Sequence, residues 1–390
     1  MADDTRRGAA RRGRVAVLGL DTFSRKNRPQ LEGLNARGFV YDVFAADTLG
    51  DSRETVPLGN TFARMAPSAA GRLRQLVRYF RSHRGAVHHA EVYPGGRFAA
   101  LYVGVAKAFG VPVMVVERGD LLFMRRYGRA TALSMRAAYR LADVVWYREL
   151  YQRAGLEALG VRRLFFLANA VTVRRRTDGA ALRDIDFVWV NRLIAERKSA
   201  WFVNALARPA YAGTRNAMLG FLGERVVVQG TLQNERYVRE RALPNLELHE
   251  FTDPAPVLGR SRFFVLPSDI VFCNNALLEA MAAGVVPLVS DVEGARLIVD
   301  HGINGFVFDH TEAGLCAAMD RALRLPAAEY DRMSRAAAEK VRTHFDVNRW
   351  FDALAAEYRR IGGSAAGGAA AGRPEALPSP AANGGDRARA

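Results

Sequence analysis

The stretch LPSDIVFCNNALLEAMAAGVVPLVSDVEG, residues 266–294, contains the end of one strand, a loop, a helix and a second strand. The preceding run FFV makes the first strand fully apolar, which is typical of a buried strand. NALLEAMAAG has helical spacing and ends at Gly284, a natural helix C-cap. A helix between two short buried strands predicts parallel pairing through a helical crossover.

The same alternation extends in both directions along the chain. Strands are predicted at residues 14–20, 39–47 and 111–117, at the end of 132–147, at the start of 186–193, and at 225–230, 246–251, 263–268, 285–290 and 305–309. Helical segments lie between many of them. The polar segment 172–184 separates two such series. We therefore expect an α/β protein with two Rossmann-like domains, residues 13–175 and 180–345, facing each other across a cleft. The Gly-, Ala- and Pro-rich residues 362–390 are predicted to be disordered, as are residues 1–12.

The net charge of +16 is concentrated in the first half of the chain. Residues 1–180 contain 31 Lys and Arg against 15 Asp and Glu, and residues 181–390 contain 25 of each. A basic half suggests an anionic partner, such as a phosphorylated acceptor, an anionic membrane surface or nucleic acid. No aromatic-basic interleaving or known binding module favours specific nucleic-acid recognition.

Cysteine content and hydropathy exclude several classes of protein. Two cysteines provide neither a disulfide framework nor a zinc cluster, which fits a reducing compartment. No stretch approaches the roughly 20 apolar residues of a membrane span. The short apolar run after residue 13 reads as a strand and not as a signal peptide. A cytoplasmic location is expected, with peripheral attachment to the inner face of the membrane as an option.

Two stretches of the second half are candidate binding loops. In NRLIAERKSAWFVNALA, Arg192, Arg197 and Lys198 stand between a strand and a helix, where helix N-termini attract anions. These residues suggest a diphosphate clamp, although a solvated basic loop would have the same composition. In the opening stretch, Glu279 could accept hydrogen bonds from the diol of a ribose. The alternative for Glu279 is a helix carboxylate paired with a neighbouring arginine.

The order and spacing of four motifs within residues 186–345 add a resemblance. NRLIAERK, LPSDIVFCNNALLEAMAAG, SDVEGARLIVDHG and INGFVFD resemble the donor-binding half of GT-B glycosyltransferases of the family 4 type, also known as glycosyl transferases group 1. The first half resembles this family more weakly, through its strand–helix alternation. The resemblance implies a GT-B fold, a nucleotide-diphosphate sugar as co-substrate, retention of configuration and no metal or other cofactor. It also implies a C-terminal helix, residues 346–361, that packs back toward the first domain.

The resemblance also suggests roles for individual residues. Arg192 and Lys198 match the pair that grips the donor diphosphate, with Arg197 as a third candidate. Glu279 matches the glutamate that holds the ribose. The glutamate that meets the transferred sugar should stand at position 271, where this chain has Val271.

Neighbouring polar groups could compensate for the missing glutamate. Asn274 and Asn275, together with the amides of their loop, could contact the sugar hydroxyls in its place. No metal site is expected, because the one Asp-x-Asp sequence, Asp184 and Asp186, precedes a strand and does not follow one.

Two features of the first half bear on an acceptor. Glu117, in VERGD after a predicted strand, could orient an acceptor hydroxyl, with a Glu–Arg surface pair as the alternative. In GRLRQLVRYFRSHR, residues 71–84, leucines and Phe80 share one helix face and arginines another. Such a helix could lie on an anionic membrane surface, or pack in the core with a solvated basic face.

These observations predict a glycosyltransferase that moves a sugar from a nucleotide-diphosphate donor to an acceptor. We expect it to be a hexosyltransferase-like enzyme in polysaccharide or glycolipid synthesis. The acceptor could be lipid-linked or phosphorylated. The alternative is a non-catalytic GT-B-like scaffold or partner subunit, which Val271 motivates.

Overall fold

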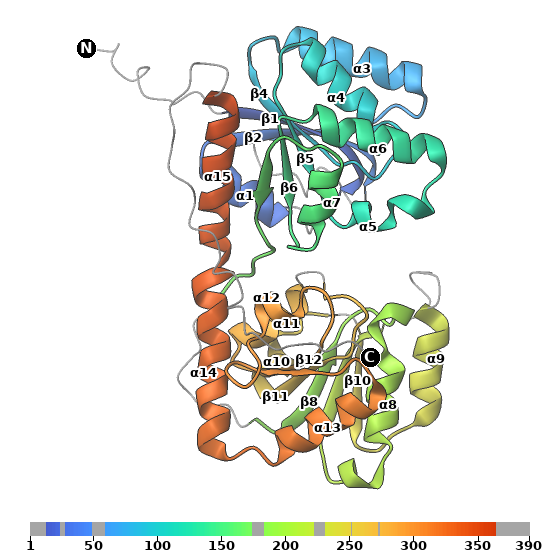
Figure 1. The fold of residues 1–390 in the computed structure, drawn as a ribbon, viewed down its shortest axis with the longest axis vertical. Helices are drawn as coiled ribbons and strands as arrows, with labels where there is room; N and C mark the ends of the chain where they lie inside the picture. Colours follow the sequence, from blue (N-terminus) through green and yellow to red (C-terminus); the bar gives the residue numbers. More distant parts are fainter. Residues whose placement is uncertain are drawn as a thin grey trace, which may run out of the picture. The chain divides into compact units, whose positions relative to one another are not determined.

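The computed structural model describes residues 13–23, 28–48, 59–173, 183–221, 231–250, 252–271 and 274–363. These residues form two compact units (Figure 1). Unit 1 combines the described residues up to Ala168 with those from Asn348 onward, and unit 2 is Asn169–Val347. None of the described helices is long and apolar enough to cross a membrane.

Unit 1 is built on a parallel sheet with the strand order β3-β2-β1-β4-β5-β6-β7. The strands are β1 (Gly13–Phe23), β2 (Phe39–Thr48), β3 (Thr61–Arg64), β4 (Val87–Val92), β5 (Val113–Val116), β6 (Val144–Tyr147) and β7 (Leu164–Phe166). The chain adds strands outward from β1 on one side, then crosses to β4 and continues on the other side. The order of the strands therefore reverses between β1 and β4.

The helices of unit 1 follow the strands in the order expected of crossovers. They are α1 (Arg28–Asn35), α3 (Ala69–Ser82), α4 (Ala99–Ala108), α5 (Asp120–Phe123), α6 (Arg129–Leu141), α7 (Gln152–Ala158) and α15 (Val347–Gly363). Buried side chains of α3, α4, α6 and α7 share one core with alternate residues of the strands, including Ala16, Leu18 and Val92. In Figure 1 these helices lie together on one side of the sheet of unit 1.

The opposite face of that sheet is covered by α1 and α15, and it contains a buried polar network. The Tyr358 hydroxyl on α15 donates to the Glu91 carboxylate on β4, and the Tyr41 hydroxyl lies 3.2 Å from the Tyr358 oxygen. At the edge of the network, Arg37 Nε pairs with Asp352 at 2.7 Å. These contacts join the last described helix to strands formed more than 250 residues earlier.

This network predicts a pH dependence of stability. Burial raises the pKa of Glu91 from its ordinary 4.5 to about 7, opposed by the Tyr358 hydrogen bond and the nearby Arg148. The folded chain therefore retains a proton that the unfolded chain loses, and the unfolding free energy falls as pH rises from about 4.5 to about 7. The neighbouring His89 does not add charge, because burial lowers its pKa well below the ordinary value.

The substitution Glu91→Gln should remove this contribution. Between pH 5 and pH 8 the wild type is expected to lose up to about 3 kcal/mol more stability than the variant. Urea unfolding at both pH values measures the difference. Glu32→Gln, on the exposed face of α1, is the matched control and should behave as the wild type does. Parallel pH profiles for Glu91→Gln and wild type would contradict the prediction.

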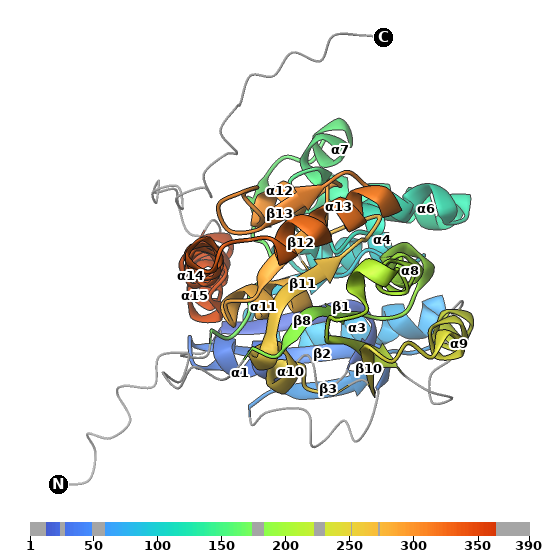
Figure 2. The same ribbon diagram turned by 90° about the horizontal axis from the view of Figure 1, so that it is seen from below.

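Unit 2 repeats this topology with a second parallel sheet, in the order β10-β9-β8-β11-β12-β13. Its strands are β8 (Ile185–Val190), β9 (Asn216–Phe221), β10 (Leu246–Glu250), β11 (Ser261–Leu266), β12 (Val286–Ser290) and β13 (Phe306–Phe308). Here the order reverses between β8 and β11. Figure 2 shows the strands of unit 2 with α8 and α13 over one face and α11 and α14 over the other.

The helices of unit 2 divide between the two faces of its sheet. They are α8 (Ser199–Leu206), α9 (Thr231–Arg241), α10 (Ala255–Arg260), α11 (Asn275–Ala282), α12 (Ala295–Ile298), α13 (Glu312–Leu323) and α14 (Ala327–His344). The fully buried Phe187, Trp189 and Phe263 belong to the core that α8 and α13 share. Both units are thus doubly wound sheets, as the alternation of apolar strands and helices predicts.

Several predicted boundaries differ from the structure. Strands at residues 61–64, 164–166 and 216–221 were not predicted. The strand predicted at 225–230 lies outside the described residues, as do residues 1–12 and 364–390. The final helix extends to Gly363, two residues beyond the predicted end. In α3, Leu76, Tyr79 and Phe80 are buried in the core, while Arg74, Arg78 and Arg81 are exposed. The helix therefore packs in the core and leaves a basic face to solvent.

Candidate functional site

The strand order of unit 2 indicates where a ligand would bind. In open parallel sheets, ligands sit beyond the carboxyl ends of the strands, at the point where the strand order reverses. In unit 2 that point lies between β8 and β11. Residues 191–198 follow β8 and residues 267–274 follow β11, so the two motifs found by sequence meet here.

Hydrogen bonds from the side chain of Arg197 and to the carbonyl of Glu196 hold these two loops together. Arg197 Nη1 donates to Ser268 Oγ and to the Ile270 carbonyl, each at 2.8 Å. The Asp269 amide donates to the Glu196 carbonyl at 2.8 Å. Burial lowers the pKa of Arg197, and its Nε is buried without a hydrogen-bond partner among the described residues. Arg197 thus binds the two loops to each other while keeping one donor unused.

Lys198 lies in the strained left-handed region, with φ 48°, immediately before α8. Its Nζ is 2.9 Å from Asp269 Oδ2, and the other oxygen of Asp269 is 2.8 Å from His310 Nε2. Asp269 therefore orients the lysine that sequence reasoning proposed, although neither Asp269 nor His310 was predicted to belong to the site. The sequence signal for Asp269 is an acid three residues after the buried strand β11.

Arg192 is the exposed member of the basic group. It follows β8 by two residues, and its backbone amide donates to Asn191 Oδ1 at 3.2 Å. Arg192, Arg197 and Lys198 therefore have different surroundings. Arg197 hydrogen-bonds to the loop after β11, and Lys198 is oriented by Asp269. Arg192 presents its guanidinium to solvent.

The start of α11 positions the remaining predicted residues. Asn274 is the N-cap, and its Oδ1 accepts from the Leu277 amide at 3.0 Å. Asn275 is exposed, and Glu279, half-buried, lies one turn further on the same helix face. Val271 is fully buried, and its amide donates to the Glu293 carbonyl at 3.2 Å. The position where the family has a sugar-binding glutamate is therefore a packed apolar position in this chain.

In unit 1, Glu117 is fully buried at the end of β5. Its carboxylate accepts from the amides of Gly119 (2.6 Å) and Leu121 (3.2 Å), from Gln152 Nε2 (3.2 Å) and from the Tyr139 hydroxyl. Burial raises its pKa to about 7. The Glu–Arg surface pair does not describe it, and neither does an open carboxylate. In this structure Glu117 holds the turn that follows β5.

The Asp-x-Asp sequence takes part in ion pairs at the amino end of β8. Asp184 pairs with Arg215 (2.7 Å) and Arg260 (2.6 Å), and Asp186 pairs with Arg262 (3.1 Å). These pairs lie at the opposite end of β8 from the loop that contains Lys198. Among the described residues, no three His, Cys, Asp or Glu side chains gather as a metal site would require.

Comparison with known proteins agrees with this geometry. Residues 184–324 match the family model described as Glycosyl transferases group 1. The sucrose-phosphate synthase of Thermosynechococcus elongatus has a TM-score of 0.72 at 15% identity, with 90% of this chain and 100% of that chain covered. A glycosyltransferase of Rickettsia africae gives 0.71 at 11% identity, covering 90% and 99% of the two chains.

A third similar structure was solved with ligands. HepE of Anabaena, in complex with UDP and glucose, has a TM-score of 0.70 at 14% identity, with 89% of this chain and 100% of that chain covered. No curated protein shows significant sequence similarity to the chain. The matched family segment spans the loops after β8 and β11 and all of α11. The chain therefore has the GT-B fold, and its residues 184–324 match a group 1 glycosyltransferase domain.

Proposed function

We propose that unit 2 binds a nucleotide-diphosphate sugar at the reversal point between β8 and β11, and that the enzyme transfers the sugar to an acceptor. The observation that carries the proposal is the joining of the two motif loops through Arg197 and Asp269. Arg192 and Lys198 would bind the diphosphate, and Glu279 would hold the ribose. Arg197 would act as a positioning residue and as a further donor through its Nε.

The chemistry required of these residues is mainly electrostatic. When the bond between sugar and diphosphate breaks, negative charge builds up on the departing diphosphate. Cations fixed in advance stabilise that charge, because they need no reorganisation as the bond breaks. Lys198 is fixed by its ion pair with Asp269 and by its backbone geometry. We propose that this arrangement replaces a metal and that the configuration of the sugar is retained.

The first test is calorimetric binding of UDP, GDP and their sugar conjugates. UDP is the first choice because the similar HepE structure contains it. Glu279→Ala should weaken the preferred nucleotide at least about tenfold, since charge-assisted hydrogen bonds are worth about 1.5–3 kcal/mol. Glu329→Ala, a helix carboxylate on α14, is the matched control and should bind as wild type does.

The rival to a catalytic role is a scaffold or partner subunit, and buried Val271 favours it. Nucleotide binding without any transfer or hydrolysis of the sugar would support the rival. Absence of binding to every nucleotide would remove the proposed donor site altogether. Hydrolysis of one conjugate that Glu279→Ala suppresses would dispose of the rival.

The acceptor is proposed to be part of a polysaccharide or glycolipid, presented at an anionic membrane surface. The support lies on α3 and α6, where Leu73, Leu133 and Leu141 are exposed among exposed arginines. Each arginine near an anionic leaflet contributes about 1 kcal/mol. Co-sedimentation with anionic against zwitterionic vesicles tests this part. The anomeric configuration of the product and the activity in EDTA test retention and metal independence.

A further inference from the structure

Unit 1 has its own reversal point, between β1 and β4, and a pocket lies beside it. The pocket has a volume of about 50 Å³. Its lining comes from the ends of β1 and β2, the residues after β3 and β4, and the first turns of α3 and α4. The pocket therefore occupies the same topological position in unit 1 that the donor loops occupy in unit 2.

The wall of the pocket contains a glycine that no other residue could replace without strain. Gly19 on β1 has φ 80°, and a Cβ there would lie 2.5 Å from the Tyr93 carbonyl oxygen and 3.2 Å from the Tyr102 ring. The lack of a side chain allows β1 to approach the segment after β4 closely. Gly19 thus permits the close approach of these two segments beside the pocket.

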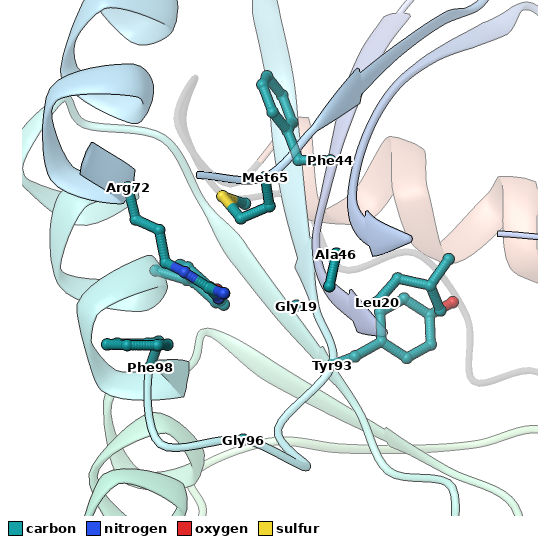
Figure 3. A pocket seen from close by; sticks show the side chains of 10 residues that line it. Gly19, Leu20, Phe44, Ala46, Met65, Arg72, Tyr93, Gly96 and Phe98 are labelled. Atoms are coloured by element: carbon teal, nitrogen blue, oxygen red, sulfur yellow. The ribbon is translucent and has the colours of Figure 1, made fainter. Parts of the chain in front are cut away.

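Arg72, in the first turn of α3, supplies the positive charge of the pocket. Its guanidinium carbon lies 4.3 Å from the centre of the Phe98 ring, and Nη1 donates to the Tyr102 hydroxyl. Its Nε is buried and has no hydrogen-bond partner among the described residues. Figure 3 shows the Arg72 side chain running from its helix toward Phe98, on the side of the pocket opposite Tyr93. A guanidinium in the wall of a pocket favours an anionic group there, because hydrogen bonds between charged partners are the stronger ones.

The rest of the lining suggests what carries that group. Phe98 and Tyr93 provide aromatic surface, of the kind on which flat or ring-shaped groups pack. Arg97 and Arg118 are exposed, and their guanidinium carbons lie 4.7 Å from the Phe98 centroid and 5.5 Å from the Tyr93 centroid. A volume of about 50 Å³ holds a few waters or one small charged group, so the pocket is too small for a whole sugar.

We infer that this pocket binds an anionic group of the acceptor, a phosphate or a carboxylate, through Arg72. The ring or chain that carries the group would lie against the aromatic rim. The inference rests on the proposed function, since it assumes that unit 1 holds the acceptor. It deepens that function by naming the class of acceptor, which is acidic. The excess of positive charge in the first half of the chain agrees with such a partner.

Ligand-observed NMR titration tests the inference, with glucose 1-phosphate and glucuronic acid as probes and glucose as the neutral reference. Titrations are run on the full chain with saturating UDP, so that phosphate bound at the donor site is displaced. Arg72→Met keeps an apolar stem over Phe98 and removes the charge. We expect it to weaken the preferred anion at least about tenfold, while UDP affinity is unchanged. Arg78→Met, on the exposed face of the same helix, should bind both as wild type does.

A second variant tests the pocket without touching Arg72. Gly96 lines the pocket, and a Cβ there would meet no atom within 4 Å, so Gly96→Leu should add bulk to the lining without a clash at Cβ. It should also weaken the anion at least tenfold. Preference for glucose 1-phosphate over glucuronic acid would indicate a phosphorylated acceptor, and the reverse preference an acidic sugar.

The outcomes separate this inference from the proposed function. Anion binding equal in wild type, Arg72→Met and Gly96→Leu would overturn the inference and leave donor binding standing. Glucose binding as tightly as both anions would overturn it too. If the wild type does not bind UDP but binds the anion in a way that depends on Arg72, the proposed donor function is wrong and the anion site stands.

Discussion

Replacing Lys198 with glycine is expected to lower kcat/KM for the donor at least about 100-fold without destabilising the protein. Removing one preorganised charge from developing negative charge typically costs about 2.7–4 kcal/mol of transition-state stabilisation. Stability should change little, because glycine adopts φ 48° without the roughly 1–2 kcal/mol that a side chain costs there. The ion pair with Asp269 is partly exposed and adds at most about 1 kcal/mol.

Ala242 provides the matched control for Lys198→Gly. It is the other non-glycine residue with positive φ among the described parts of the chain, at 43°. Ala242→Gly relieves the same backbone strain outside the donor loops, so it should leave kcat/KM unchanged. Nucleotide release from the preferred nucleotide sugar measures activity, and urea unfolding measures stability. Full activity in Lys198→Gly would contradict the role of the lysine, and equal loss in Ala242→Gly would assign the effect to the backbone.

Restoring the family's glutamate through Val271→Glu is expected to destabilise the chain by about 3 kcal/mol or more. Val271 is fully buried, and a buried carboxyl group must either find a partner, stay protonated or disrupt its surroundings. Its pKa would rise, so the loss should grow as pH increases. Urea unfolding at pH 5 and pH 8 measures both effects.

Asn275→Glu is the control for this substitution. It places the same side chain at the exposed first position of α11, where a negative charge favours a helix N-terminus. Its stability should lie within about 0.5 kcal/mol of wild type. A Val271→Glu variant as stable as this control would mean that residue 271 can reach solvent. The loop would then be able to offer a sugar-binding carboxylate.

The alternation of strands and helices could be predicted from sequence because most strands are apolar runs that lie between segments of helical period. The stretch from Ser261 to Ser290 alone contains a full crossover unit, and its spacing matches the structure. Strand β9 was missed because NAMLGF has few β-branched residues and contains Gly220. That glycine is needed there, since a Cβ would lie 1.6 Å from the Asn191 carbonyl oxygen.

The site could be predicted only in part. Motif spacing proposed Lys198 and Glu279 as donor-binding residues, because their side chains suit a diphosphate and a ribose. It did not identify Asp269 as the partner of Lys198, since the two are separated by about 70 residues and meet only through the sheet order. The burial of Glu117 could not be predicted from sequence either. The four groups that donate hydrogen bonds to its carboxylate come from three separate segments of unit 1.

The place of α15 in the chain has a consequence for protein synthesis. Among the described residues, unit 2 is one continuous segment, whereas unit 1 needs a helix that is translated after that segment. Until α15 leaves the ribosome, Tyr41 and the Glu91 carboxylate lack the tyrosine that covers them. Multidomain chains usually complete their N-terminal part first. Here the half that is made first is finished last, so newly made unit 1 must wait with the part of its sheet that α15 covers still exposed.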